Sequence, residues 1–164
     1  SVRFNLLQEG YTVPKRIVLD PEGQFPDNCR LLTKVDSEII VVTSETGKQS
    51  LDKKEALKAK ITPLVVPVNN NMFNWQELLY IIYDHGITSL LLEGGQGVFT
   101  TALEAEIVDK LVLFMAPKLL GGVQSPTFFA GQGVKNLESA IKLRNMGVEL
   151  CGVDVMIQGY LNEE

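Results

Sequence analysis

A short, continuously apolar run at Ile39–Val42 restricts the fold of this chain more than any other feature. The segment Ser37–Glu45 reads SEIIVVTSE, so its central residues are all β-branched. A strand with one face in water alternates apolar and polar residues, whereas a strand buried on both faces is apolar throughout. The run therefore predicts a central strand covered on both faces, as is typical of the parallel sheets in α/β proteins.

The segments on either side of this run alternate between strand and helix patterns. Extended segments are expected at residues 16–19, 61–68, 87–95 and 109–117. Helical patterns lie between them, at residues 51–60, 74–86 and 98–106. The tail differs, because two extended runs within residues 142–161 flank the turn Cys151–Asp154 and predict an antiparallel hairpin. We therefore expect an α/β domain whose sheet is mixed but mostly parallel, with helices on its faces and the hairpin at its end.

Local signals predict where several of these elements begin and end. Ser50 is the expected N-cap of the helix at 51–60, and Asn74 is the expected N-cap of the next helix, which Gly86 should terminate. Two prolines within 61–68 favour an edge position for that strand, since proline cannot donate to a sheet. Residues 43–45 are interpreted as a capped turn before a helix rather than as a phosphate site, because Glu45 would repel an anion.

Composition excludes several classes of function. A net charge of −5 disfavours nonspecific attraction to nucleic acid or to an anionic membrane surface. No apolar run approaches the roughly 18 residues that a membrane span requires, and the first residues show no signal-peptide pattern. Cys29 and Cys151 lie far apart without metal-ligand spacing, and the single histidine, His85, is expected to serve a helix end. We expect a cytoplasmic protein with reduced thiols and no metal site.

The segment Leu90–Thr101, which reads LLLEGGQGVFTT, is the strongest candidate for a binding site. An apolar run ends at Glu93 and is followed at once by glycines, which let the backbone turn sharply and approach a ligand closely. In an open α/β sheet, ligands bind beyond the carboxyl ends of the strands. The first amides of the following helix lack intrahelical partners and lie at the positive end of its dipole. The pattern predicts a site for a phosphate or pyrophosphate, with Thr100 and Thr101 adding hydroxyl donors.

Spacing alone leaves a second interpretation of this segment open, namely a tight strand-to-helix turn with no ligand. The glycine spacing is one residue short of the dinucleotide-binding fingerprint. An ordinary Rossmann domain is disfavoured, because no Asp or Glu ends the following strand, where Met115–Pro117 stand. A phosphate-binding loop of the NTPase type is also disfavoured, since no Gly-Lys-Ser/Thr follows.

Several blocks of this sequence together resemble the reductase domain of the bifunctional deaminase–reductase of riboflavin biosynthesis. They are RIVLD, VVTSE, DHGITSLLLEGG, VDKLVLFMAPKLLGG and SPTFFAGQGV, preceded by Ser1–Arg3 at the start of the chain. The resemblance covers nearly the whole chain, and the order and spacing of the blocks make it far more specific than any single motif.

The resemblance implies a dihydrofolate-reductase-like fold and an NADPH-dependent reduction. The substrate would be 5-amino-6-(5-phosphoribosylamino)uracil, whose ribosyl chain becomes ribityl. Glu93 would contact a ribose hydroxyl, and Arg3 would donate to the substrate phosphate. No residue is identified as a general acid. The cofactor-binding residues implied by the family are Gly95, Gln96, Gly97, Val98, Phe99, Thr100 and Thr101.

Two departures from the family pattern qualify this interpretation. The family normally has a further segment before the element at Ser1–Arg3, so residues 1–164 are interpreted as a single reductase-like domain that lacks this segment. The family also tends to place a hydroxyl residue after Val-Leu-Asp, where this chain has Pro21, which has neither a hydroxyl nor an amide donor. The alternatives are a related pterin or diaminopyrimidine reductase, or a non-catalytic domain for dinucleotide binding or assembly.

Two partners besides the substrate are also expected. The apolar hairpin Val148–Leu161 is interpreted as a sheet edge that supports homodimerisation. A deaminase domain is expected to be fused to or paired with this one, since the chain itself has no His-x-Glu and Pro-Cys-x-x-Cys pair.

Overall fold

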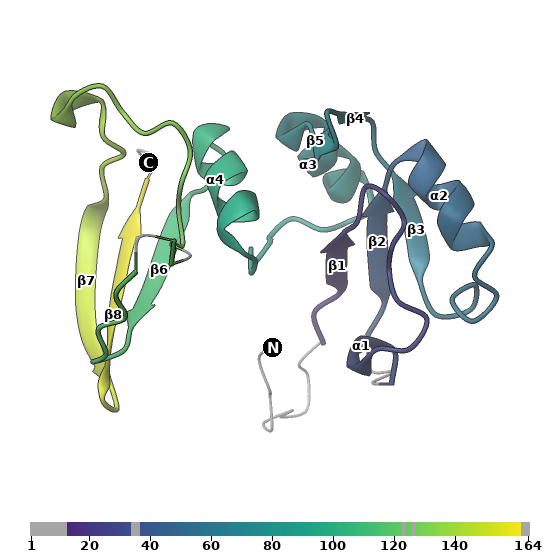
Figure 1. Cartoon of the computed structure of the whole chain (residues 1–164), viewed down its shortest axis with the longest axis horizontal. Coiled ribbons are helices and arrows are strands. Elements are labelled where there is room, and N and C mark those ends of the chain that lie inside the picture. Colours follow the sequence, from purple (N-terminus) through teal and green to yellow (C-terminus); the bar gives the residue numbers. More distant parts are fainter. Residues whose placement is uncertain (1–12, 34–36, 123, 126, 162–164) are drawn as a thin grey trace. The chain divides into compact units, whose positions relative to one another are not determined.

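The computed structural model describes residues 13–33, 37–122, 124–125 and 127–161. The chain divides into two compact units, Ser1–Thr88 and Ser89–Glu164. The parallel strands lie in the first unit and the C-terminal antiparallel strands in the second (Figure 1). The mixed α/β class predicted from the sequence is confirmed, whereas the single domain over residues 1–164 stays a prediction.

The first unit contains a three-stranded parallel sheet in the order β1-β2-β3. Its strands are β1 (Arg16–Leu19), β2 (Ile39–Thr43) and β3 (Thr62–Val65). The central strand is β2, as its sequence predicts, and β3 with its proline lies at an edge. Two further short strands, β4 (Val68–Asn69) and β5 (Met72–Phe73), form a separate antiparallel pair.

The core of the first unit is built around β2, whose five residues are all buried. Ile39 and Val41 pack on one face of the sheet, and the alternation of side chains along a strand directs Ile40 and Val42 to the other. Burying each such side chain contributes roughly 1.5–3 kcal/mol, so a charged residue at Val41 would be incompatible with this sheet. The apolar residues that join Ile39 and Val41 in one cluster are Phe25, Leu32, Leu51 and Leu57.

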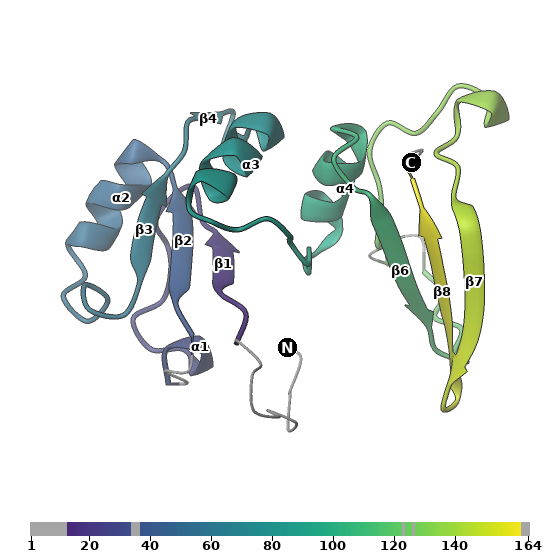
Figure 2. The ribbon, with the colours of Figure 1, turned by 180° about the vertical axis from the view of Figure 1, so that it is seen from behind.

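Three helices accompany the parallel sheet: α1 (Arg30–Thr33), α2 (Glu45–Asp52) and α3 (Trp75–Asp84). Figures 1 and 2, seen from opposite sides, show α2 against one face of the sheet and α3 against the other. The predicted ends of α3 are confirmed, because Asn74 Oδ1 accepts a hydrogen bond from Glu77 N at 3.0 Å. Gly86, just after the helix, has the positive φ of 77° that favours glycine at this position.

The predicted position of the helix after β2 is wrong. It begins at Glu45, with Ser44 as its N-cap, and ends at Asp52, whereas the sequence pattern predicted residues 51–60 capped by Ser50. The Ser44 hydroxyl accepts a bond from Gly47 N at 3.0 Å, while the Ser50 hydroxyl donates to Thr46 O within the helix. Residues 53–60 instead form successive turns that bury Leu57. Tertiary burial of Leu57 therefore overrides the helical propensity of this charged segment.

The second unit contains α4 (Gln96–Glu104) and a three-stranded antiparallel sheet in the order β6-β8-β7. Its strands are β6 (Lys110–Met115), β7 (Arg144–Cys151) and β8 (Asp154–Tyr160), and a short 3-10 helix, η1 (Leu137–Ser139), precedes β7. The predicted strand at 109–117 and the predicted C-terminal hairpin are confirmed by β6, β7 and β8.

The predicted strand at residues 87–95 is wrong, because the structure has no regular element there. A strand requires a hydrogen-bonded neighbour, and no described residue pairs with this segment in a sheet. Two of its apolar residues, Leu90 and Leu91, are exposed, Leu91 by 77%. Apolar content alone predicted a strand, but the segment has no neighbouring strand among the described residues.

Candidate functional site

The candidate site in the second unit is the glycine segment at the start of α4. A side chain at Gly94 would press against Val98, with the added Cβ 3.1 Å from Val98 Cβ. At Gly95 and Gly97 an added Cβ would meet nothing within 4 Å. Gly95 has φ −89°, a value open to any residue, so neither packing nor backbone conformation among the described residues requires glycine there. The lack of side chains leaves the backbone at the helix start uncovered.

The donors at this helix start are backbone amides. The first hydrogen bond of the helix backbone runs from Phe99 N to Gly95 O at 3.2 Å. The amides of Gln96, Gly97 and Val98 precede that bond and have no intrahelical acceptor. Gly95, as N-cap, offers no side-chain oxygen to them. Three amides and the positive end of the dipole thus face the space that the glycines leave open, which suits a phosphate or carboxylate.

The two threonines of the candidate site direct their hydroxyls into the protein. Thr100 is 8% exposed, donates to Gln96 O at 2.7 Å and accepts from Ala130 N at 3.0 Å. Thr101 donates to Val98 O at 3.2 Å. In this structure their protons therefore go to helix carbonyls, not to the open side of the helix. Val98 and Phe99 are half-buried in the same turn.

The two residues expected to contact substrate differ in how the structure places them. Glu93 is exposed and lies directly before the glycines, two residues from the N-cap Gly95. Arg3 lies outside the described residues. Glu93 is thus next to the helix start along the chain. The substrate contacts expected for Glu93 and Arg3 stay predictions.

In the first unit, the carboxyl ends of β1 and β2 are occupied by the chain's own hydrogen bonds. The Ser44 hydroxyl lies 2.6 Å from Pro21 O and donates to it, while it also accepts from Gly47 N. Pro21, which replaces the hydroxyl residue of the family, thus uses its carbonyl to hold the next strand end. The interpretation of residues 43–45 as a capped turn is confirmed. Thr43 is fully buried, and its hydroxyl has no partner among the described residues.

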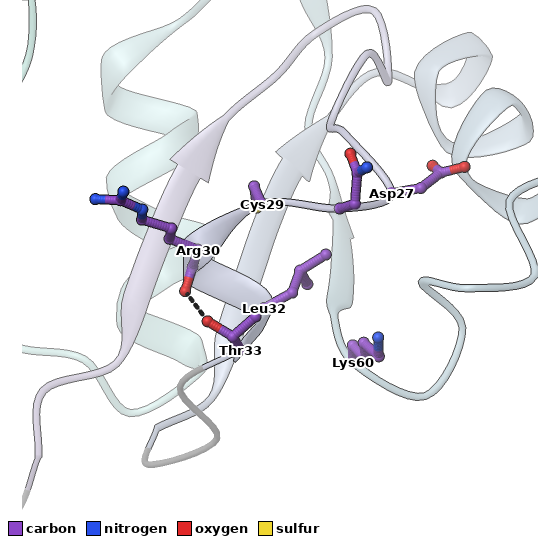
Figure 3. Close-up of a pocket in the computed structure, with 7 residues that line it drawn as sticks. Asp27, Cys29, Arg30, Leu32, Thr33 and Lys60 are labelled. Atoms are coloured by element: carbon purple, nitrogen blue, oxygen red, sulfur yellow. Dashed lines mark hydrogen bonds between the residues drawn. The ribbon is translucent and has the colours of Figure 1, made fainter.

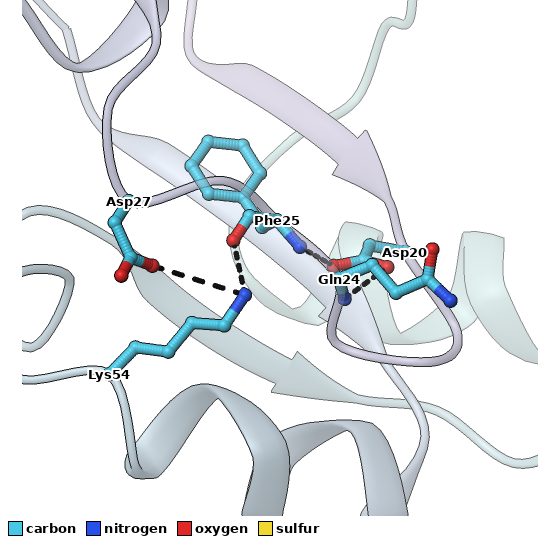
Figure 4. Close-up of polar contacts among 5 residues, drawn as sticks. All are labelled: Asp20, Gln24, Phe25, Asp27 and Lys54. Atoms are coloured by element: carbon cyan, nitrogen blue, oxygen red, sulfur yellow. Dashed lines mark hydrogen bonds and ion pairs between the residues drawn. The ribbon is translucent and has the colours of Figure 1, made fainter.

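The loop after β1 is fixed in the same way. Asp20 accepts from Gln24 N at 2.9 Å and from Phe25 N at 2.7 Å, so its carboxylate closes the turn (Figure 4). Lys54 donates to Phe25 O at 2.6 Å and lies 4.0 Å from Asp27 (Figure 4). These polar groups hold the loop and leave little capacity for a ligand.

A hollow of about 380 Å³ lies between α1 and the turn before β3. Figure 3 shows Cys29, Arg30 and Lys60 around it, with Thr33 donating to Arg30 O at 2.8 Å. Because α1 precedes β2 and Lys60 precedes β3, this hollow is at the amino edge of the parallel sheet. Ligands of open α/β sheets bind at the opposite, carboxyl edge, so we assign no role in the candidate site to this hollow.

His85 follows the last residue of α3, and its Nδ1 lies 2.8 Å from Ile81 O. That contact fits the predicted role at a helix end. Cys29 and Cys151 are free thiols, as expected. Among the described residues, no cluster of His, Cys, Asp and Glu has the arrangement of a metal site. None of the helices described is long and apolar enough to cross a membrane.

One connection at this site was missed by sequence reasoning. Gln96 Nε2 donates to Thr127 Oγ1 at 2.7 Å, which ties the first residue of α4 to a loop 31 positions further along the chain. The only sequence signal was the Phe128-Phe129-Ala130-Gly131 stretch, which indicates a packed loop but not what it packs against.

Fold and site together define an α/β protein with a helix N-terminus open to an anionic ligand, a feature that many nucleotide-binding enzymes share. The chain matches the RibD C-terminal domain family over residues 2–157 and belongs to that family. It is 33% identical to the riboflavin biosynthesis protein RibD of Actinobacillus pleuropneumoniae over 145 residues, which are 88% of this chain and 38% of that protein.

A second relative is the 2,5-diamino-6-ribosylamino-4(3H)-pyrimidinone 5′-phosphate reductase of Aquifex aeolicus. It is 30% identical over 132 residues, which are 80% of this chain and 57% of the relative. Among solved structures, the riboflavin biosynthesis reductase Rib7 of Saccharomyces cerevisiae matches with a TM-score of 0.71 at 19% identity, over 93% of this chain and 71% of that one. This likeness shows the fold, which is dihydrofolate-reductase-like. The chain thus spans less than two thirds of the length of each of these two curated relatives.

Proposed function

We propose that this chain carries the reductase activity of a riboflavin-pathway enzyme. The reaction is the NADPH-dependent reduction of 5-amino-6-(5-phosphoribosylamino)uracil, in which the ribosyl chain becomes ribityl. A hydride and a proton are added to the sugar, which opens the ring to the open-chain alcohol. The bound cofactor supplies the hydride, and the protein's task is to bind, orient and exclude water.

The observation that supports this proposal most is the open space at Gly95 and Gly97. No described neighbour and no backbone constraint requires glycine at these positions, so the backbone there is open to a group that approaches it from outside. A dinucleotide pyrophosphate fits the amides of Gln96, Gly97 and Val98, because it presents anionic oxygens to donors that have no acceptor within the helix. Membership of a reductase family favours a nicotinamide dinucleotide as this ligand.

We assign two further roles on the family resemblance. Glu93 holds a hydroxyl of the substrate ribose, and Arg3 donates to the substrate phosphate through its planar guanidinium. NADPH rather than NADH is the proposed cofactor. We assign no general acid.

A titration with NADPH and then NADH, followed by calorimetry, tests the proposal. Gly95→Asp would place a negative charge in the open space, so we expect it to weaken NADPH binding by at least about 100-fold. Gly121→Asp is the matched control, since Gly121 also has an ordinary φ and open space around an added Cβ. Equal affinity in the two variants would contradict the assignment of the cofactor to α4.

A diaminopyrimidine substrate is the second candidate, because the Aquifex aeolicus relative at 30% identity is named for the diaminopyrimidinone phosphate. The two substrates differ in the group that deamination replaces on the pyrimidine ring. Comparing kcat/KM for both with the same NADPH concentration decides between them. NADPH binding without turnover of either compound would favour the non-catalytic alternative.

We also propose a homodimer through the second sheet. The register of β6, β8 and β7 puts several apolar residues on one face, and those on the edge strand β7 are strongly exposed, Leu150 by 80%. Such an apolar face favours burial against a second copy. A monomeric mass in light scattering at micromolar concentration would contradict this. The residues that share the face are Leu111, Leu113, Met115, Val148, Leu150, Val155 and Ile157.

Two statements about the cellular setting complete the proposal. The reductase works together with a deaminase domain, fused or separate, because the RibD relatives are much longer than this chain. The reaction takes place in the cytoplasm, where free thiols such as Cys29 and Cys151 stay reduced. Fractionation and a pull-down with the deaminase would check both.

A further inference from the structure

The loop Thr127–Gly131 is bonded to α4 at two separate points. At the first residue of the helix, Gln96 Nε2 donates to Thr127 Oγ1 at 2.7 Å, and Thr127 Oγ1 in turn donates to Phe129 O at 2.7 Å. One turn later, Ala130 N donates to Thr100 Oγ1 at 3.0 Å. Because a helix rises about 1.5 Å per residue, these anchors hold the loop along the first turn of α4.

Thr100 is the central residue of this connection. The Thr100 hydroxyl accepts a hydrogen bond from the loop amide of Ala130 and donates one to Gln96 O. These two bonds join the loop to the first turn of the helix. The side chain is 8% exposed, and a buried hydrogen-bonded hydroxyl is costly to leave without partners. Its second bond ends on Gln96, whose own side chain is held by Thr127.

The loop approaches the helix closely enough to exclude a side chain. Gly131 has φ +95°, a conformation that other residues rarely adopt. An added Cβ there would overlap the carboxylate of Glu104 and lie 3.2 Å from Thr100 Cγ2. The contact therefore extends from Gln96 at the start of the helix to Glu104 at its end.

We infer that the loop Thr127–Gly131 positions the amides of Gln96, Gly97 and Val98 for the cofactor phosphate, with Thr100 as the positioning residue. This inference rests on the proposed function. The loop acts through Gln96, because Thr127 fixes the Gln96 side chain and Thr100 fixes its carbonyl. An anion at the helix start then meets amides that are already fixed, so binding loses less conformational freedom.

The test compares Thr100→Val, Thr100→Ser and Thr127→Val in the full chain. Thr100→Val keeps the shape but removes both hydroxyl bonds, and we expect it to weaken NADPH binding by about tenfold. Thr100→Ser keeps the hydroxyl and should bind within about threefold of the wild type. Thr127→Val removes two exposed bonds, the one from Gln96 and the one to Phe129 O, so it folds even if Thr100→Val does not. It should weaken NADPH binding by about threefold.

Hydrogen exchange of the helix amides provides a measurement that needs no cofactor. Thr100→Val should speed exchange at Phe99–Leu103, whereas Asn136→Ala, which removes hydrogen bonds to Ser139 at η1, should not. Wild-type affinity and exchange in both valine variants would overturn the positioning role while leaving the cofactor site intact. Failure of the wild type itself to bind NADPH would overturn the proposed function, and this inference with it.

Discussion

The two units of this chain differ in how many of their apolar side chains are buried and how many of their polar groups are hydrogen-bonded within the unit. In the first unit, β2 is buried on both faces. At the carboxyl edge, Asp20 accepts bonds from its own loop and Ser44 donates to Pro21 O. In the second unit, the strands present apolar side chains to the surface, and α4 begins with uncapped amides. The first unit is explained by its own packing, whereas the second leaves apolar side chains exposed and the first amides of α4 without a side-chain cap.

Glycines show the same difference. Gly47, in the first turn of α2, is required by packing, because an added Cβ would overlap Thr43 Oγ1 and lie 2.5 Å from Pro21 O. Gly97, in the first turn of α4, has nothing within 4 Å of an added Cβ. One glycine therefore serves the fold, and the other leaves room for a ligand.

The largest expected effect comes from Gly47→Ala. The Pro21 carbonyl and the Thr43 side chain cannot move away without disturbing Ser44, so we expect a loss of about 3 kcal/mol in the free energy of unfolding. Urea denaturation followed by circular dichroism measures it. The same change at Gly97 is the control and should raise helix stability by up to about 1 kcal/mol, since alanine favours a helix over glycine. Equal changes in unfolding free energy for Gly47→Ala and Gly97→Ala would contradict the view that packing requires glycine at Gly47 but not at Gly97.

A smaller effect of opposite sign is expected for Thr43→Val. The Thr43 hydroxyl is fully buried and has no hydrogen-bond partner in the part of the chain that the structure describes. Replacing it with a methyl group of similar size should therefore stabilise the protein by about 1 kcal/mol. Thermal unfolding measures this change. NADPH affinity should not change, because the hydroxyl points at Gly47 within the first unit. A stability loss together with weaker NADPH binding would show that Thr43 serves a ligand after all.

Elements whose signals are local were predictable from the sequence. The β-branched run of β2 and the capped helix α3 each depend on neighbouring residues, and the hairpin of β7 and β8 depends on a turn between two extended runs. The start of α2 was mispredicted because Ser44 and Ser50 are equally good caps in sequence, and only the packing of Gly47 decides between them.

The candidate site was predictable only in part, for a similar reason. The glycines and the helix behind them follow from local sequence, and the open amides follow from helix geometry. The bond between Thr100 and Ala130 joins residues 30 positions apart, so no local pattern contains it. The expected strand before Glu93 failed because a strand depends on a neighbour, which residues 87–95 do not specify by themselves.

The smallest expected effect is the pH dependence of the ion pair between Lys15 and Glu38, at the amino end of the parallel sheet. Lys15 Nζ lies 3.0 Å from Glu38, and with a hydrogen bond from Thr62 it lowers the pKa of the Glu38 carboxyl below its ordinary value of 4.5. A lowered pKa in the folded state means that the pair stabilises the protein above about pH 4.5, and that this contribution is lost as the pH falls through the folded-state value.

Both side chains are exposed, so Glu38→Gln should cost no more than about 0.5 kcal/mol at pH 7. The difference in melting temperature between the variant and the wild type should shrink as the pH falls below 4.5, because Glu38 becomes protonated, and also in high salt, because screening weakens an exposed pair. A difference that stays the same at low pH and in high salt would mean that Glu38 acts through its hydrogen bond to Thr62 and not through its charge.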